Sequence, residues 1–121
     1  MKKLVIVEDE KMIRQGIKII ALRSQVPIEE IIECKNGVEA LEIMKSQLID
    51  VMITDIRMPK MDGIQLIKEV NTLPCVPKVF VISGYDDFSY VVEFLRNGVK
   101  EYLLKPVDRT KLITALENVN F

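Results

Sequence analysis

Three short, uninterrupted apolar segments constrain the fold of this chain more than any other feature of its sequence. They are KLVIV at 3–7, VMIT at 51–54 and KVFVIS at 78–83. Strands that are buried on both faces of a parallel sheet carry apolar residues at consecutive positions rather than at alternate ones. Two more mixed segments, EIIEC at 30–34 and EYLL at 101–104, suit strands nearer the edges of the same sheet.

Apolar residues at helical spacing follow each of the five segments. The five periods are marked by Ile13, Ile17 and Ile20; by Val38, Leu41 and Met44; by Ile64, Ile67 and Val70; by Phe88, Val91, Val92 and Leu95; and by Leu112, Leu116 and Val119. Gly98 suits the C-terminal end of the fourth helix. Five strand–helix pairs with right-handed crossovers predict an α/β fold, in which a doubly wound parallel sheet lies between two helical layers.

Composition limits the classes of function. The chain has 121 residues, which is the size of one domain, and its net charge of −1 argues against a surface that binds nucleic acid. No apolar run approaches the roughly 20 residues of a membrane span. Cys34 and Cys75 have neither disulfide nor metal-ligand spacing, so we expect two buried, reduced thiols in a cytoplasmic protein. The chain contains no histidine, which excludes a histidine base or metal ligand.

Polar residues gather where the predicted strands end. In parallel sheets, sites form in the loops beyond the carboxyl ends of the strands. The residues at these ends are Glu8, Asp9 and Glu10 after the first strand, Asp55 after the third, Ser83 and Gly84 after the fourth, and Lys105 and Pro106 after the fifth. Carboxylates, a hydroxyl and a lysine are therefore expected at one edge of the sheet.

The acidic residues at this edge predict a bound cation. Neighbouring carboxylates repel one another and raise their own pKa values unless a cation lies between them. Oxygen ligands without histidine or cysteine favour a hard ion such as Mg²⁺. Glu10 is explained by helix capping, because acids are favoured at a helix N-terminus. Capping does not explain Asp9 and Asp55, which lie at the ends of two different strands.

Four of these segments together resemble a known family. VIVEDE, TDIRMPKMDG, ISGYDD and EYLLKPVD, in this order and spacing, resemble the receiver domain of two-component response regulators. The resemblance extends from Lys3 to Asn118, and it treats residues 1–121 as one receiver domain. It implies the flavodoxin-like (βα)5 three-layer sandwich, with five parallel strands in the order 2-1-3-4-5.

The resemblance assigns roles at the site. It implies that Asp55 accepts a phosphoryl group from a sensor histidine kinase, and that Lys105 pairs with the phosphoryl oxygens. Glu8, Asp9, Asp55 and the main-chain carbonyl of Arg57 are implied ligands of Mg²⁺, for which Mn²⁺ could substitute. Glu8 stands where the family more often has aspartate, and its longer side chain still presents a carboxylate. Such a domain catalyses its own aspartyl phosphorylation and slow dephosphorylation.

The resemblance also implies a switch. Ser83 is expected to bond the phosphoryl group, and Tyr102 to turn inward when Ser83 moves. Phosphorylation would then bias a face made by the fourth helix, the fifth strand and the fifth helix.

Three further expectations concern residues around the acceptor. Arg57 and Tyr85 are implied to flank the phosphoryl group and to tune its hydrolysis. Because both side chains are large, we expect a long-lived acyl phosphate. The peptide bond between Lys105 and Pro106 is expected to be cis, since X–Pro bonds alone adopt this form cheaply.

Residues 82–108 resemble receivers that precede an AraC-type DNA-binding domain. We therefore expect a fragment of a longer regulator rather than a stand-alone receiver, with DNA bound only through an output domain that this chain lacks. Self-association on phosphorylation stays open, as does the oligomeric state.

Three other functions were weighed. A haloacid-dehalogenase-type phosphatase needs a second acid two residues after the nucleophile, where this chain has Arg57. A flavin carrier needs a phosphate-binding loop after the first strand, and the acidic segment at 8–11 would repel phosphate. The alternative that stays open is a pseudo-receiver, which acts as an interaction module without phosphorylation.

Overall fold

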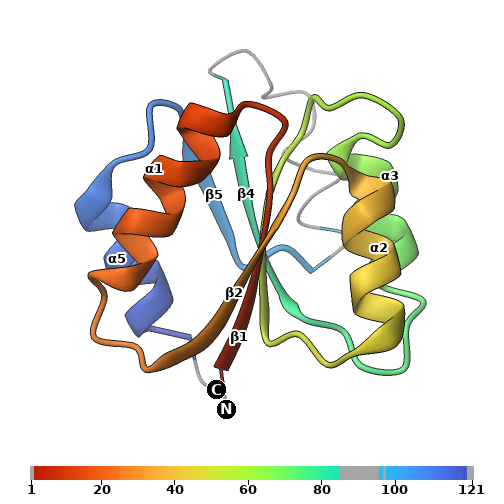
Figure 1. The fold of residues 1–121 in the computed structure, drawn as a ribbon, viewed down its shortest axis with the longest axis horizontal. Coiled ribbons are helices and arrows are strands. Elements are labelled where there is room, and N and C mark those ends of the chain that lie inside the picture. Colours follow the sequence, from red (N-terminus) through yellow and green to blue (C-terminus); the bar gives the residue numbers. More distant parts are fainter. Residues whose placement is uncertain (1, 85–95, 97, 120–121) are drawn as a thin grey trace.

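A five-stranded parallel sheet forms the centre of the protein (Figure 1). The computed structural model describes residues 2–84, 96 and 98–119. Its strands are β1 (Lys2–Val7), β2 (Ile28–Cys34), β3 (Val51–Asp55), β4 (Lys78–Ser83) and β5 (Glu101–Leu104). Their order across the sheet is β2-β1-β3-β4-β5. The predicted doubly wound α/β fold and the strand order implied by the resemblance are both confirmed.

Helices cover both faces of this sheet, which gives three layers. The described helices are α1 (Lys11–Leu22), α2 (Gly37–Ser46), α3 (Gly63–Val70) and α5 (Arg109–Glu117). Figure 1 shows α1 and α5 on one face and α2 and α3 on the other. The helix expected around Phe88–Leu95 lies outside the described residues. Gly98 has a φ of 75°, which is the left-handed conformation expected of a glycine that ends a helix.

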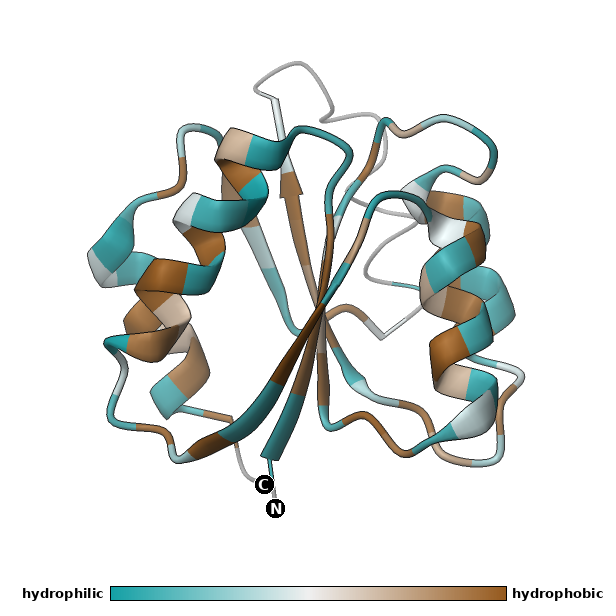
Figure 2. Ribbon diagram, in the orientation of Figure 1, coloured by the Kyte–Doolittle hydropathy of each residue, from teal (hydrophilic) through white to brown (hydrophobic). Residues whose placement is uncertain are grey.

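Two apolar cores hold the layers together, one on each face of the sheet. The central strands supply consecutive buried residues to both, and Figure 2 shows apolar positions concentrated there while the helices carry apolar and polar positions together. In β1, for example, Val5 and Val7 face one core, and Leu4 and Ile6 face the other. This alternation explains the uninterrupted apolar runs of the sequence.

The expectation of two buried thiols is wrong for one of them. Cys34 ends β2 and is buried, whereas Cys75 is exposed. Cys75 lies in the connection between α3 and β4, outside the helices and strands, and it is not among the residues of either described core. Within the described ranges, none of the helices combines the length and the apolar character that crossing a membrane would require.

Candidate functional site

The carboxyl ends of β1 and β3 bring three acidic side chains together. Glu8 and Asp9 follow β1, and Asp55 is the last residue of β3. Their carboxylates each offer an oxygen within 4.8 Å of the others. Glu8 and Asp55 are buried, with exposed fractions of 1% and 7%, whereas Asp9 is exposed. A site with two buried carboxylates and one accessible carboxylate therefore opens at this edge of the sheet.

Lys105 supplies a positive charge to the two buried carboxylates. Its Nζ lies 2.8 Å from Oε1 of Glu8 and 3.1 Å from Oδ2 of Asp55. Burial alone would lower the pKa of Lys105, but the contacts with Glu8 and Asp55 outweigh burial and raise it. The lysine is consequently held in its charged form between the ends of β1 and β3.

The environment of Glu8 disfavours its charged form. Burial raises its pKa to about 7, Lys105 opposes this shift, and Asp9 and Asp55 add to it. Its Oε2 accepts a hydrogen bond of 3.2 Å from the main-chain N–H of Glu10. Its buried Oε1 contacts Lys105 as an ion pair but has no aligned hydrogen bond among the described residues. The ammonium of Lys105 therefore supplies the positive charge that compensates this buried oxygen.

These residues fit a hard divalent cation. Three carboxylates converge, two of them are buried, and neither histidine nor thiolate contributes to the cluster. This is the donor set that Mg²⁺ takes, usually with water completing its coordination. Arg57, whose carbonyl is the further expected ligand, lies two residues after Asp55 and is exposed.

Main-chain contacts fix the end of β3 around Asp55. The N–H of Ile56 donates 2.8 Å to Oδ1 of Asp55, and the Thr54 hydroxyl donates 2.8 Å to the Asp55 carbonyl. The N–H of Gly63, the first residue of α3, donates 2.7 Å to the carbonyl of Ile56. A Cβ at Gly63 would meet the main chain of Asp55 and Ile56, so this close approach requires glycine.

Ser83, the last residue of β4, contacts Tyr102, which lies within β5. Their hydroxyl oxygens lie 2.6 Å apart, and the Ser83 oxygen also lies 3.2 Å from the carbonyl of Gly84. Ser83 is fully buried and Tyr102 is half-buried. The expected partners of the switch are thus already joined here. Tyr85, the second residue expected to tune hydrolysis, lies outside the described residues.

The loops at this edge carry two further features. The peptide bond between Lys105 and Pro106 is cis, as the resemblance implies. Lys60, in the loop that follows Asp55, has a φ of 69°, which is unusual for a residue with a side chain.

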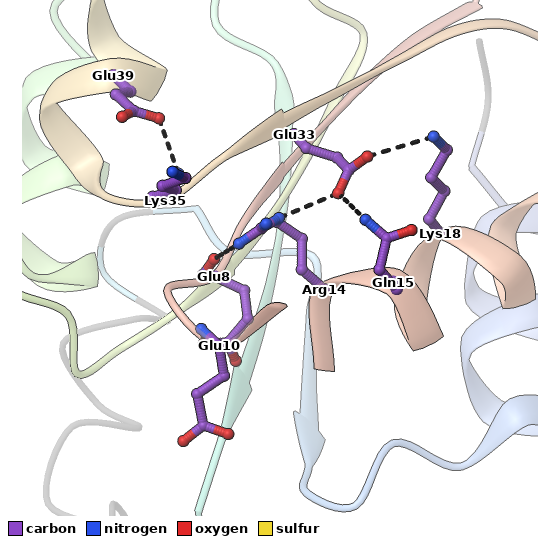
Figure 3. A network of polar contacts seen from close by, with 8 residues as sticks. All are labelled: Glu8, Glu10, Arg14, Gln15, Lys18, Glu33, Lys35 and Glu39. Carbon is purple, nitrogen blue, oxygen red and sulfur yellow. Dashed lines mark hydrogen bonds and ion pairs between the residues drawn. The ribbon is translucent and has the colours of Figure 1, made fainter. Parts of the chain in front are cut away.

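Two features around β1 were not foreseen. Glu10 occupies the N-cap position of α1, as expected of an acid at a helix N-terminus, but its side chain makes no capping hydrogen bond; its own N–H donates to the side chain of Glu8. Arg14 is buried and bonds the main-chain carbonyl of Glu8 (Figure 3). Its position, three residues before Ile17 on the apolar face of α1, was the signal available in the sequence.

Comparison with known proteins agrees with this geometry. A sequence profile of the family described as "Response regulator receiver domain" matches residues 4–117. The transcriptional regulatory protein HptR of Staphylococcus aureus is 40% identical over 112 residues, which are 93% of this chain and 44% of HptR. The chain thus spans less than half the length of such relatives.

Solved structures give the same result. The receiver domain of AraT from Geobacillus stearothermophilus is 37% identical, with a TM-score of 0.79 over 96% of this chain and 90% of that one. A two-component transcriptional regulator AraC from Clostridium phytofermentans is 30% identical, with a TM-score of 0.83 over 97% and 90% of the two chains. This chain therefore belongs to the family of receiver domains of two-component response regulators.

Proposed function

We propose that this receiver domain accepts a phosphoryl group on Asp55 from a sensor histidine kinase and thereby switches an output. One observation carries the proposal. The buried carboxylate of Asp55 lies 3.1 Å from the ammonium of Lys105, beside the acidic pair Glu8 and Asp9. A nucleophile, a cation for the phosphoryl oxygens and ligands for a metal ion are thus gathered at one point, as phosphoryl transfer requires.

In the proposed step, a carboxylate oxygen of Asp55 attacks the phosphorus of a phosphohistidine. The P–O bond forms as the P–N bond breaks, and the electron pair leaves with the imidazole of the kinase. The Ile56 N–H donates a hydrogen bond to Oδ1 of Asp55 and so fixes the orientation of the carboxylate. Lys105 already contacts Asp55, so its ammonium can pair with the phosphoryl oxygens instead of the carboxylate without a large movement.

Glu8, Asp9, Asp55 and the main-chain carbonyl of Arg57 would hold Mg²⁺, or Mn²⁺ in its place. When bound, the ion supplies positive charge to the phosphoryl oxygens. The convergence of these three carboxylates, two of which are buried, supports this assignment from the protein side.

An apolar groove beside Lys105 suits the kinase surface that carries the histidine. The groove has a volume of about 470 Å³ and lies between α1 and the loop after β5. Its lining includes Ile13, Gly16, Ile20 and Val107, and it reaches Lys105 at its edge. A partner that brings a phosphohistidine to Asp55 must lie next to Lys105, so we assign the groove to that partner.

Gly16 allows the groove to be tested separately from the chemistry. A Cβ there meets nothing within 4 Å, so a side chain at this position starts without a clash in the domain itself. We expect Gly16→Gln to slow transfer from a kinase that phosphorylates the wild type by about tenfold. Labelling by acetyl phosphate, which needs no docked protein, should be unchanged. Equal slowing of both reactions would contradict the assignment.

The switch that we propose starts at the buried pair of hydroxyls. To donate to a phosphoryl oxygen, Ser83 must turn its proton away from Tyr102 and Gly84, which loosens its contact with β5. We propose that this change alters the face that includes β5 and α5, and that it acts on transcription through a DNA-binding output domain. Self-association of the phosphorylated domain through this face, and a cytoplasmic location, belong to the same proposal.

Mass spectrometry of the intact protein tests the function directly. The protein is incubated with acetyl phosphate in Mg²⁺ or in EDTA, as the wild type and as Asp55→Asn. We expect one phosphoryl adduct that requires both Mg²⁺ and Asp55. No adduct under any condition would favour a pseudo-receiver that acts by binding alone. The decay of the adduct in Mg²⁺ also tests the expected slow hydrolysis, which a lifetime of seconds would contradict.

A further inference from the structure

A buried guanidinium lies directly behind the acidic pair. Arg14, in the first turns of α1, is only 7% exposed. Arginine is rarely buried unless its charge is paired and its N–H groups are hydrogen-bonded, because desolvation is costly. The contacts that compensate Arg14 therefore indicate what the residue does at this position.

Arg14 joins the end of β1 to the end of β2. Its Nη1 donates 2.9 Å to the main-chain carbonyl of Glu8, and its Nε donates 3.0 Å to Oε1 of Glu33 (Figure 3). The two acceptors lie on adjacent strands. A planar guanidinium can reach both at once because its N–H groups point in fixed, separate directions, which a lysine ammonium on a flexible stem does not reproduce.

Glu33 is itself held by three side chains of α1. Besides Arg14, Gln15 donates to Oε1 at 2.5 Å and Lys18 donates to Oε2 at 3.2 Å. Partial burial disfavours the charged form, but the hydrogen bonds from Arg14 and Lys18 outweigh it and lower the pKa of Glu33. Glu33 thus remains an ionised, fixed anchor for the guanidinium.

The segment that carries the acidic pair is tied to Arg14 at both ends. The side chain of Arg14 holds the Glu8 carbonyl, and its main-chain N–H donates 2.9 Å to the carbonyl of Glu10. The Glu8 N–H donates 3.0 Å to the Cys34 carbonyl, which continues the pairing with β2. Asp9 therefore lies between two carbonyl groups that one residue orients.

We propose that Arg14 is a positioning residue for the metal-binding carboxylates of Glu8 and Asp9. It acts through the Glu8 carbonyl, and Glu33 fixes its guanidinium from the far side. The inference rests on the proposed function of the acidic pair. Arg14 would thus orient these carboxylates from the main-chain side, before any phosphoryl group binds.

Mn²⁺ binding to the unphosphorylated domain, followed by the electron paramagnetic resonance signal of the free ion, provides the test. The variants are Arg14→Lys, which keeps the positive charge but loses the planar guanidinium, and the pair Glu33→Ala and Glu33→Gln. Both Glu33 variants lose a carboxylate charge, but only alanine also loses the oxygen that accepts from Arg14. The free energy of unfolding of each variant is measured by urea in EDTA, where no metal contributes.

We expect the Mn²⁺ dissociation constant to rise about tenfold in Arg14→Lys and about threefold in Glu33→Ala, and to stay within about twofold in Glu33→Gln. A purely structural role would lower the stability of the variants and leave the affinity of the folded protein unchanged, which would overturn the proposal. Equal losses of Mn²⁺ affinity in Glu33→Ala and Glu33→Gln would also overturn it, because they would indicate an effect of charge rather than of position.

If Arg14→Lys does not fold, the comparison of the two Glu33 variants decides. A wild type that binds no Mn²⁺ would instead refute the metal site itself.

Discussion

Gly63→Ala tests whether the close packing behind Asp55 is needed for both stability and chemistry. Gly63 begins α3, and a Cβ there would lie 2.9 Å from the Cα of Ile56 and against the carbonyl of Asp55. Carbon atoms in contact normally lie at about 3.5 Å or more, so the main chain must separate by at least about 0.6 Å, and the carbonyl oxygen of Asp55, which is closer still, requires more. The obstructing atoms belong to the backbone, and no side chain can turn aside to make room.

The expected cost follows from this geometry. Overpacking that forces backbone shifts destabilises proteins by about 1–3 kcal/mol, and the hydrogen bond from Gly63 to the Ile56 carbonyl would be lengthened as well. The same shift moves Asp55 relative to Lys105. Displacements of this size can slow a positioned reaction by about tenfold or more, so labelling by acetyl phosphate should slow even where the variant is fully folded.

Gly16→Ala is the matched control. Gly16 lies inside α1, and a Cβ there has no neighbour within 4 Å, so alanine should raise the free energy of unfolding by about 1 kcal/mol through helix propensity. Urea unfolding of both variants in EDTA, together with initial labelling rates in Mg²⁺, gives the comparison. A Gly63→Ala protein as stable as the wild type, with an unchanged labelling rate, would refute the steric argument.

Three further predictions rest on other residues. Lys60→Gly should raise the free energy of unfolding by about 1 kcal/mol, because glycine adopts the φ of 69° without strain; urea denaturation that shows a loss would contradict this. Burial, with a smaller contribution from Glu39, raises the pKa of Cys34 to about 11, so a thiol reagent at about pH 8 should modify Cys75 alone in the native protein and both cysteines in denaturant. The pKa of Glu33 is lowered from 4.5, so the stability that its charge contributes is complete above that value and is lost as the pH falls through the lower pKa of the folded state. The difference in stability between the wild type and Glu33→Gln should therefore shrink in acid, and a difference independent of pH would show that the charge of Glu33 contributes nothing.

The sequence predicts the strands well where both of their faces are buried. The segment 78–83 coincides with β4, and β3 extends one residue further than predicted, to Asp55. The mixed segment 101–104 also coincides with the edge strand β5. β2 begins at Ile28, two residues before the predicted segment, because its first residues differ in burial and no uninterrupted apolar run marks its start. The order of the strands came from the resemblance, since periodicity alone does not determine which strands are neighbours.

The sequence also predicts some residues of the candidate site and not others. Residues that come directly after an apolar strand could be assigned to one edge of the sheet, because parallel strands end together. Arg14 could not be found by this rule, since its function depends on a carbonyl of β1 and a carboxylate of β2 that no sequence pattern pairs. Glu10 lies at the N-cap position of α1 as predicted, but its sequence position does not reveal that its side chain makes no capping hydrogen bond.

The placement of Lys105 and Tyr102 indicates why β5 would transmit a signal. Tyr102 lies within β5 and contacts Ser83, and Lys105 follows the strand and contacts Asp55 and Glu8. A phosphoryl group that attracts both Ser83 and Lys105 would therefore act on one strand from two points. β5 has four residues and lies at the end of the sheet order, with β4 as its neighbour, so fewer hydrogen bonds resist its movement than resist that of β1 or β3. The structural change that follows a charge added at Asp55 would thus be small in the central strands and larger at β5, where it would alter the surface.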